Sequence, residues 1–239
     1  MIKHKFIISL LALLMLSLNA CTGVVIKEAT YAPLKAKQGQ EQALADFLVE
    51  GAGLVAKTEP KTLVWAGLKN KDGMMIFDVF EDASGREAHF AGQVAAALKD
   101  NAGVLVQGGW DKGVLADVRN PKVLSAKTSN NPSEMKIAMF VPFKAKAGQA
   151  IALADFLKSA APMVEKTEPK TAYWFAIQIS EDEFAVIDFF ADQSGVDAHF
   201  GGKVAAALKA NSEALIEGGW DKGIVANAQR FEVLVMISK

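Results

Sequence analysis

The chain has 239 residues, of which 51% are hydrophobic and 22% are charged, and its formal net charge is −1. Such a balanced charge provides no basic field to hold nucleic acid, so nucleic-acid-binding proteins are excluded as a class. The hydrophobic content is enough for a core in each of two domains of about 105 residues. No apolar run beyond the N-terminus reaches the length that spans a membrane.

Residues 1–20 have the pattern of a signal peptide. A short basic start, residues 1–5, precedes an apolar run over residues 6–18 that is too short to span a bilayer comfortably. The run ends in Leu18-Asn19-Ala20-Cys21, which resembles the lipobox of bacterial lipoproteins. The resemblance implies cleavage before Cys21 and acylation of its thiol. The alternative is an ordinary secretory signal with a cysteine nearby.

Acylation at Cys21 would anchor the protein to a membrane of the bacterial cell envelope, since each buried CH₂ contributes roughly 0.8 kcal/mol. Thr22 follows this cysteine, where retention in the inner membrane usually calls for aspartate. We therefore expect the periplasmic face of the outer membrane. Cys21 is also the chain's one cysteine, so no internal disulfide can form.

The rest of the chain is a tandem duplication. Residues 88–99 return as residues 198–209 with substitutions at two positions, and Gly-Gly-Trp-Asp-Lys-Gly at 108–113 returns unchanged at 218–223. A spacing of 110 residues is too long for a solenoid repeat and fits a whole duplicated domain. We predict one repeat over residues 21–128, a polar linker over 129–135 and a second repeat over 136–239.

Each repeat is predicted to begin with a strand, at 27–34 and 136–143, followed by a helix. In the second strand copy alternate residues are apolar, as in a half-buried strand. The helix carries an apolar stripe in both copies, and Pro162 predicts a kink or an early end in the second copy. Two further strands follow in each repeat, at 63–68 and 74–80 and at 172–179 and 184–190.

A second helix is predicted to carry His89 or His199 in its first turns, with Ser84 and Ser194 as its N-terminal caps. A short helical turn, the Gly-Gly-Trp loop and a last strand close each repeat, at 122–127 and 231–238. The order βαββαβ is that of a ferredoxin-like sheet with helices on one face. Two such sheets can cover each other's open face, so we predict an α+β fold in which both repeats pack as an intramolecular dimeric α+β barrel. The chain is then its own pseudo-dimer, and a further oligomer stays open.

The motifs resemble the antibiotic biosynthesis monooxygenase family of dimeric α+β barrels, which includes small quinol monooxygenases. The family pattern is Glu-Pro-Gly-Thr, an aromatic residue, an acidic-x-aromatic strand end and Ala-x-x-Ala-His. The matching residues are Glu59-Pro60-Lys61-Thr62, Trp65, Asp78-Val79-Phe80 and Glu87-Ala88-His89, and Glu168-Pro169-Lys170-Thr171, Trp174, Asp188-Phe189-Phe190 and Asp197-Ala198-His199. Here lysine stands for the family's glycine, and tryptophan for its tyrosine.

The resemblance implies a monooxygenase that needs neither metal nor flavin and acts with O₂ on a small electron-rich aromatic substrate, such as a quinol or an anthrone. His89 and His199 would be the bases, because the pKa of histidine is close to working pH. Asp78 and Asp188 would orient them. The alternatives are partly exposed histidines that bond a local carboxylate, and aspartates that face solvent or pair with lysine.

Two pairs of tryptophans are candidates for substrate binding. Trp65 and Trp174 would line the cavity with a flat apolar surface and one N–H donor each. Trp110 and Trp220 either gate the mouth of a cavity or fix their loop to the domain.

No metal site is predicted, because one histidine per repeat and a single cysteine do not make a typical ligand set. Haem is an alternative implied by the fold, since haem-degrading barrels share it. A non-catalytic lipoprotein that binds a small apolar ligand or another envelope protein is the second functional hypothesis. A cavity enclosed by the paired sheets and lined by His89 and Trp65 would favour the enzyme. An interior filled by Phe and Met would favour the binding protein.

Overall fold

The computed structural model describes residues 25–239. The predicted signal peptide and Cys21 lie outside these residues. Within them, no helix has both the length and the apolar character needed to cross a membrane.

The first repeat consists of a strand, a long helix, a hairpin, two consecutive helices, a π-helical turn and a last strand. These are β1 (Glu28–Leu34), α1 (Glu41–Thr58), β2 (Thr62–Asn70), β3 (Gly73–Phe80), α2 (Ala83–Phe90), α3 (Gln93–Leu105), η1 (Asp111–Leu115) and β4 (Lys122–Lys127). A short 3₁₀ turn, η2 (Pro132–Glu134), lies in the linker between the repeats.

The second repeat follows the same plan with its first helix divided. Its elements are β5 (Ile137–Lys144), α4 (Ala150–Lys158), α5 (Ala161–Thr167), β6 (Tyr173–Gln178), β7 (Glu183–Phe190), α6 (Gln193–Phe200), α7 (Lys203–Leu215), η3 (Gly219–Ile224), η4 (Val225–Asn227) and β8 (Gln229–Ser238). Pro162 stands in the first turn of α5, so the predicted interruption of this helix is confirmed.

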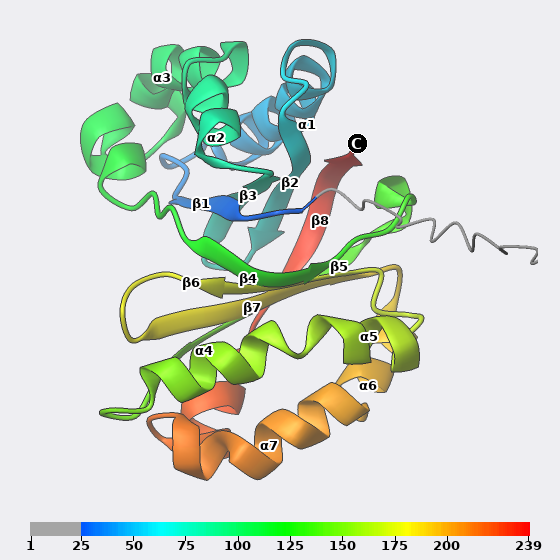
Figure 1. Cartoon of the computed structure of the whole chain (residues 1–239). Helices are drawn as coiled ribbons and strands as arrows, with labels where there is room; N and C mark the ends of the chain where they lie inside the picture. Colours follow the sequence, from blue (N-terminus) through cyan, green and yellow to red (C-terminus); the bar gives the residue numbers. More distant parts are fainter. Residues whose placement is uncertain (1–24) are drawn as a thin grey trace, which may run out of the picture.

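The eight strands close into one antiparallel barrel in the order β1-β3-β2-β8-β5-β7-β6-β4. This confirms the predicted α+β barrel and pseudo-dimer. Helices α1–α3 cover one outer side of the barrel and α4–α7 cover the opposite side (Figure 1). Closure leaves no free sheet edge, which removes the hazard of edge-to-edge association.

The last strand of each repeat pairs mainly with the other repeat, an exchange that the sequence did not predict. Strand β4 meets its own β1 at the single pair Glu28–Lys122 but pairs with β6 along most of its length. Strand β8 pairs with β2 and, through its first residues, with β5. Each four-stranded sheet is therefore completed from the opposite half of the chain.

The interior of the barrel is packed with aromatic and aliphatic side chains. The ring centroid of Phe77 lies 5.4 Å from that of Phe175 and 6.1 Å from that of Phe189. Tyr173 and Met75 belong to the same buried cluster. The paired sheets thus enclose a hydrophobic core. A hollow of about 540 Å³ is lined in part by residues of this cluster, among them Met75, Phe140 and Phe231.

Two local predictions were wrong. His89 lies in the last turn of α2, because the chain leaves the helix at Ala91 and begins α3 after an extended Gly92. The N-terminal cap of α2 is Asp82, not Ser84: the Asp82 carboxylate accepts hydrogen bonds from the Gly85 amide and the Ser84 hydroxyl at 3.1 and 2.7 Å. In the second repeat the N-terminal cap of α6 is likewise Asp192 and not Ser194. A charged carboxylate is a stronger acceptor for the free amides of a helix start.

Candidate functional site

The outer face of each half-barrel carries an aspartate and a tryptophan side by side. Asp78 on β3 is the cross-strand partner of Trp65 on β2, and Asp188 is the partner of Trp174 in the second repeat. Neighbouring Phe77 points into the barrel core, so the alternation of strand side chains directs Asp78 towards the helices. Asp78 and Trp65 are each only 1% exposed.

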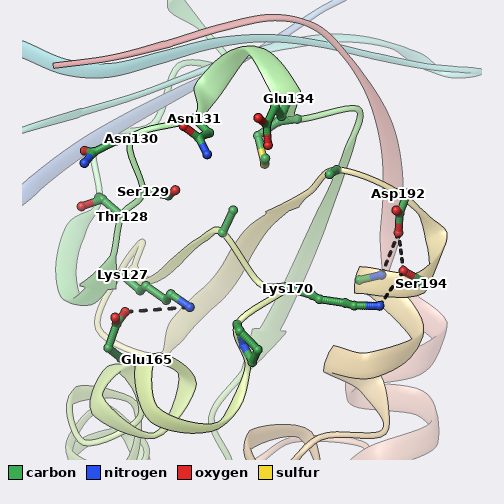
Figure 2. Close-up of a pocket in the computed structure, with 15 residues that line it drawn as sticks. Lys127, Thr128, Ser129, Asn130, Asn131, Glu134, Glu165, Lys170, Asp192 and Ser194 are labelled. Atoms are coloured by element: carbon green, nitrogen blue, oxygen red, sulfur yellow. Dashed lines mark hydrogen bonds and ion pairs between the residues drawn. The ribbon is translucent and has the colours of Figure 1, made fainter.

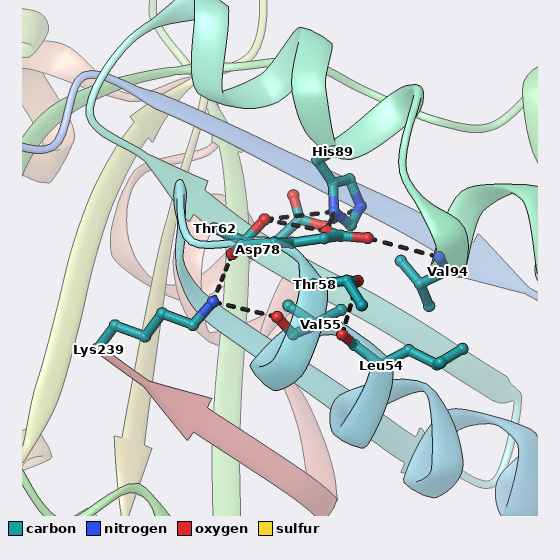
Figure 3. A network of polar contacts seen from close by, with 9 residues as sticks. Leu54, Val55, Thr58, Thr62, Asp78, His89, Val94 and Lys239 are labelled. Atoms are coloured by element: carbon teal, nitrogen blue, oxygen red, sulfur yellow. Dashed lines mark hydrogen bonds and ion pairs between the residues drawn. The ribbon is translucent and has the colours of Figure 1, made fainter.

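His89 lies between two carboxylates. Its Nε2 forms an ion pair with Asp78 Oδ2 at 3.3 Å, and its Nδ1 faces Glu59 Oε2 at 2.6 Å (Figure 3). The corresponding distances from His199 are 3.1 Å to Asp188 and 2.5 Å to Glu168. The predicted pairing of aspartate and histidine is therefore present, whereas the alternatives of a solvent-facing aspartate and an exposed histidine are wrong.

Glu59 and Glu168 complete the site, although the sequence analysis did not select them. Glu59 follows the last residue of α1, and its second oxygen, Oε1, accepts the Val94 amide of α3 at 3.4 Å. The Thr62 hydroxyl donates to Oε2 at 3.2 Å. The one signal was the Glu-Pro-Lys-Thr motif, which stands before each histidine in both repeats.

The exchanged strands hold in place the short loop that carries Glu59 or Glu168, which is called the glutamate loop below. Lys127 on β4 donates to the backbone carbonyl of Glu168 at 3.0 Å. Lys239, directly after β8, donates to the backbone carbonyls of Glu59 and Val55 (Figure 3). Each site thus depends on a lysine from the other repeat.

Burial and charge set the protonation of the three groups. Burial lowers the pKa of His89, but the Asp78 and Glu59 carboxylates outweigh it and raise that pKa above its ordinary value. The same balance raises the pKa of His199 to about 10. Burial would raise the pKa of Glu59, yet hydrogen bonds, first from His89, lower it. Burial raises the pKa of Asp78 to about 6 despite the nearby His89. The carboxylates therefore favour the protonated, imidazolium form of both histidines.

A small pocket opens beside each aspartate, between the sheet and the helices. The first has a volume of about 40 Å³ and the second about 30 Å³, enough for a few water molecules and too small for an aromatic ring. Asp78 Oδ1 and the Trp65 indole nitrogen are buried in the first pocket's lining and have no hydrogen-bond partner among residues 25–239. The same atoms of Asp188 and Trp174 lack partners in the second pocket.

Trp110 and Trp220 line the outer part of these pockets and are half-buried. The Lys209 ammonium lies 5.7 Å from the centroid of the Trp220 ring, which fixes that ring to α7. Phe90 and Leu115 also line the first pocket and are 40% and 45% exposed, so they form an apolar rim. The structure therefore places all four tryptophans at the two pockets.

A larger hollow of about 750 Å³ lies between the linker and the start of α6 (Figure 2). Both of its lysines already have partners: Lys127 faces Glu165 at 3.8 Å, and Lys170 donates to Ser194 at 3.0 Å. None of the buried atoms without a hydrogen-bond partner belongs to its lining. We therefore assign no function to this hollow.

The pocket residues do not fit a haem. Both ring nitrogens of His89 and of His199 face carboxylates, so neither is free to ligate iron. Among residues 25–239, no group of three or more His, Cys, Asp or Glu side chains is arranged to hold a metal ion.

The sequence matches no protein-family model and no curated protein. A provisionally assigned monooxygenase from Fusobacterium nucleatum superposes with a TM-score of 0.71 at 15% identity, over 90% of this chain and 95% of its own. The chain has the fold of the antibiotic biosynthesis monooxygenase-like proteins. An anthrone oxidase-like protein superposes with a TM-score of 0.53 at 12% identity, over 89% of this chain and 93% of its own. Identities this low establish the fold alone.

A shorter protein of unknown function from Nitrosomonas europaea is more similar in sequence. It is 39% identical over 44% of this chain and 96% of its own, with a TM-score of 0.40. Its function is not established, so it adds nothing on activity.

Proposed function

We propose that this protein is a cofactor-independent monooxygenase of a quinol-like or anthrone-like aromatic substrate. Such a substrate, once deprotonated, reduces O₂ by itself, so the protein has to supply a base and a pocket without bulk water. For an anthrone, one O₂ is consumed, one oxygen atom becomes the new ring carbonyl, and the other leaves as water with the two hydrogens of the methylene carbon. The monooxygenase-like fold supports this proposal without deciding the substrate.

The observation that carries the proposal is the pair of unpartnered polar atoms beside each other in each pocket. A buried carboxylate oxygen and a buried indole N–H each lose hydrogen-bond energy if nothing meets them. A phenolic or enolic hydroxyl satisfies both, because it accepts from Trp65 Nε1 and donates to Asp78 Oδ1. Trp174 and Asp188 offer the same pair in the second repeat.

These contacts divide the roles differently from the sequence-based hypothesis. Both nitrogens of His89 face carboxylates, which favour its protonated form, so it is a positioning residue that stabilises the Asp78 carboxylate. Asp78 takes the proton of the substrate. Its pKa of about 6 lies close to working pH, where a general base is most effective. Asp188 has the same role beside His199.

The pocket has to widen before it can take an aromatic ring, because the present volume is about 40 Å³. The exposed rim of Phe90 and Leu115 is the part of the lining with the fewest packing restraints. Movement there would admit the substrate and leave Asp78 and Trp65 fixed on the barrel.

Oxygen uptake with anthrone tests the proposal. We expect the double variant Asp78→Asn, Asp188→Asn to lose about 10²–10⁴-fold of the enzymatic rate, since general bases contribute this much and the amide keeps the shape. Asp72→Asn, an exposed carboxamide substitution in the β2–β3 turn, is the matched control and should retain the wild-type rate. An unchanged rate in the double variant would rule out both aspartates as bases.

The filled barrel interior favours the second hypothesis, a non-catalytic protein that binds a small apolar ligand in the same pockets. In that case the wild-type protein would bind anthrone but consume no oxygen above the spontaneous rate. The assay therefore distinguishes the two functions directly.

We also propose that the protein is a lipoprotein of the bacterial envelope, anchored through Cys21 and facing the periplasm. The support is the sequence of residues 1–22 alone. Metabolic labelling with palmitate, followed by separation of inner and outer membranes, tests both the anchor and the location.

A further inference from the structure

The two pockets differ at the strand next to the aspartate. On β1, Thr30 is the cross-strand partner of Asp78, whereas on β5 the partner of Asp188 is Met139. Both side chains are buried and lie on the outer face of the barrel. The duplication has thus kept the aspartate and the tryptophan but exchanged a hydroxyl for a thioether.

Thr30 adds a polar atom to the first pocket. It lines that pocket, and its hydroxyl has two acceptors within reach: Asn120 Oδ1 at 3.0 Å and the Asp78 carboxylate, whose pKa the hydroxyl lowers. In either case the Thr30 oxygen can still accept a hydrogen bond. Met139 instead packs in an apolar cluster with Ile137, Phe190 and Val196.

The residues around Thr30 are also more polar than the residues around Met139. In the first repeat the buried Glu28 lies beside Thr30 on β1, pairs with Arg86 at 2.5 Å and also contacts Lys122. In the second repeat Ile137 on β5 and Val196 on α6 lie in the apolar cluster with Met139. Of these residues Thr30 alone belongs to the lining of the first pocket, and Met139 lies outside the lining of the second.

We propose that the two pockets select different ligands: the first an aromatic molecule with two hydroxyls, the second one with a single hydroxyl. Thr30, Asp78 and Trp65 lie on three adjacent strands, which are spaced about 4.8 Å apart. One hydroxyl of a 1,3-dihydroxyarene would donate to Thr30 and the other would meet Asp78 and Trp65, since all three residues line the first pocket. The assignment of the second oxygen rests on the proposed function.

Calorimetric titration without oxygen, which prevents turnover, tests this selectivity with two probes, 1-naphthol and 1,3-dihydroxynaphthalene. In the wild-type protein we expect both pockets to bind the naphthol and the first pocket to bind the diol about tenfold more tightly than the second, which is the effect of one hydrogen bond. Thr30→Val keeps the shape without the hydroxyl and should abolish that preference. Thr30→Ser, which keeps the hydroxyl, should preserve it.

The reciprocal change should create the preference in the second repeat. Arg230 occupies the position of Asn120, so Met139→Thr together with Arg230→Asn rebuilds the polar pair. This variant should bind two equivalents of the diol tightly, provided that thermal unfolding shows an intact fold. Equal ratios of diol to naphthol affinity in the wild-type and Thr30→Val proteins would overturn the inference.

Failure of this inference is separable from failure of the proposed function. If anthrone is oxidised but Thr30→Val leaves the affinity ratio unchanged, the selectivity alone is wrong. If the ratio shifts as expected and no oxygen is consumed, the pockets bind as inferred and the protein is not an oxygenase.

Discussion

At the scale of single residues, the site depends on how one histidine is shared by two carboxylates. Asp78 and Glu59 compete for the same imidazolium, and their environments differ. Glu59 receives additional hydrogen bonds from Thr62 and Val94, so it stays ionised. Asp78 keeps one oxygen without a partner and is the more basic of the two. We therefore expect the proton of a substrate hydroxyl to transfer to Asp78 and not to Glu59.

The pH dependence of the reaction follows from these pKa values. Asp78 must be ionised to accept a proton, so kcat/KM of the first pocket should be low in acid and rise through pH about 6. The measurement uses an Asp188→Asn variant, which leaves the first pocket alone active, after subtraction of spontaneous oxidation. The converse variant, Asp78→Asn, gives the pH dependence of kcat/KM for the second pocket. If its rate rose only through pH about 10, the base would be His199 and not Asp188.

At the scale of secondary structure, the break between α2 and α3 forms the site. It ends α2 one residue after His89 and places the Val94 amide of α3 against Glu59. A negative charge there is stabilised by the start of a 13-residue helix. A β-carbon at Gly92 would lie 2.5 Å from Glu59 Oε1, so this position has room for glycine alone. Gly202 and Glu168 repeat the arrangement.

Replacing Gly92 by alanine should therefore destabilise the protein by about 1–3 kcal/mol, because Glu59 has to move away from His89. Gly103→Ala in α3 is the matched control, since its β-carbon would meet no atom within 4 Å. The control should stabilise the helix by about 0.5–1 kcal/mol. Chemical denaturation measures both changes, and equal effects of the two substitutions would contradict the role of Gly92.

At the scale of the whole molecule, the exchange of β4 and β8 makes the two repeats interdependent. Strand β4 finds most of its hydrogen bonds on β6, and β8 finds most of its on β2. The strand exchange also affects the candidate sites, because Lys127 and Lys239 each contact the glutamate loop of the opposite repeat. Neither repeat has a complete sheet or a complete site by itself.

The first repeat expressed alone, as residues 25–128, should consequently form a homodimer. Its β4 would pair with β2 of a second copy, since β2 is the equivalent of β6. Sedimentation equilibrium measures the association, with the full chain as the reference. A folded, monomeric first repeat would show that the exchanged strand is dispensable for the fold.

Much of the fold could be predicted because it is encoded locally. Turns, apolar stripes and the repeat of 110 residues give the order of elements, and Pro162 alone marks the divided helix. The candidate residues Asp78, His89 and Trp65 also follow from short motifs. Glu59 stands in such a motif as well, but the motif does not reveal its role, since its contact with His89 joins residues 30 positions apart.

The sequence by itself therefore determined the duplication, the class of fold and the main polar residues of the site. The tertiary structure alone decided which face of the sheet carries that site. Almost every residue of β3 is buried, because core packs on one face and helices on the other, so no polar alternation marks the inner side. Barrel closure fixed Phe77 inside and Asp78 outside, brought Glu59 to His89, and left the candidate pocket between sheet and helices.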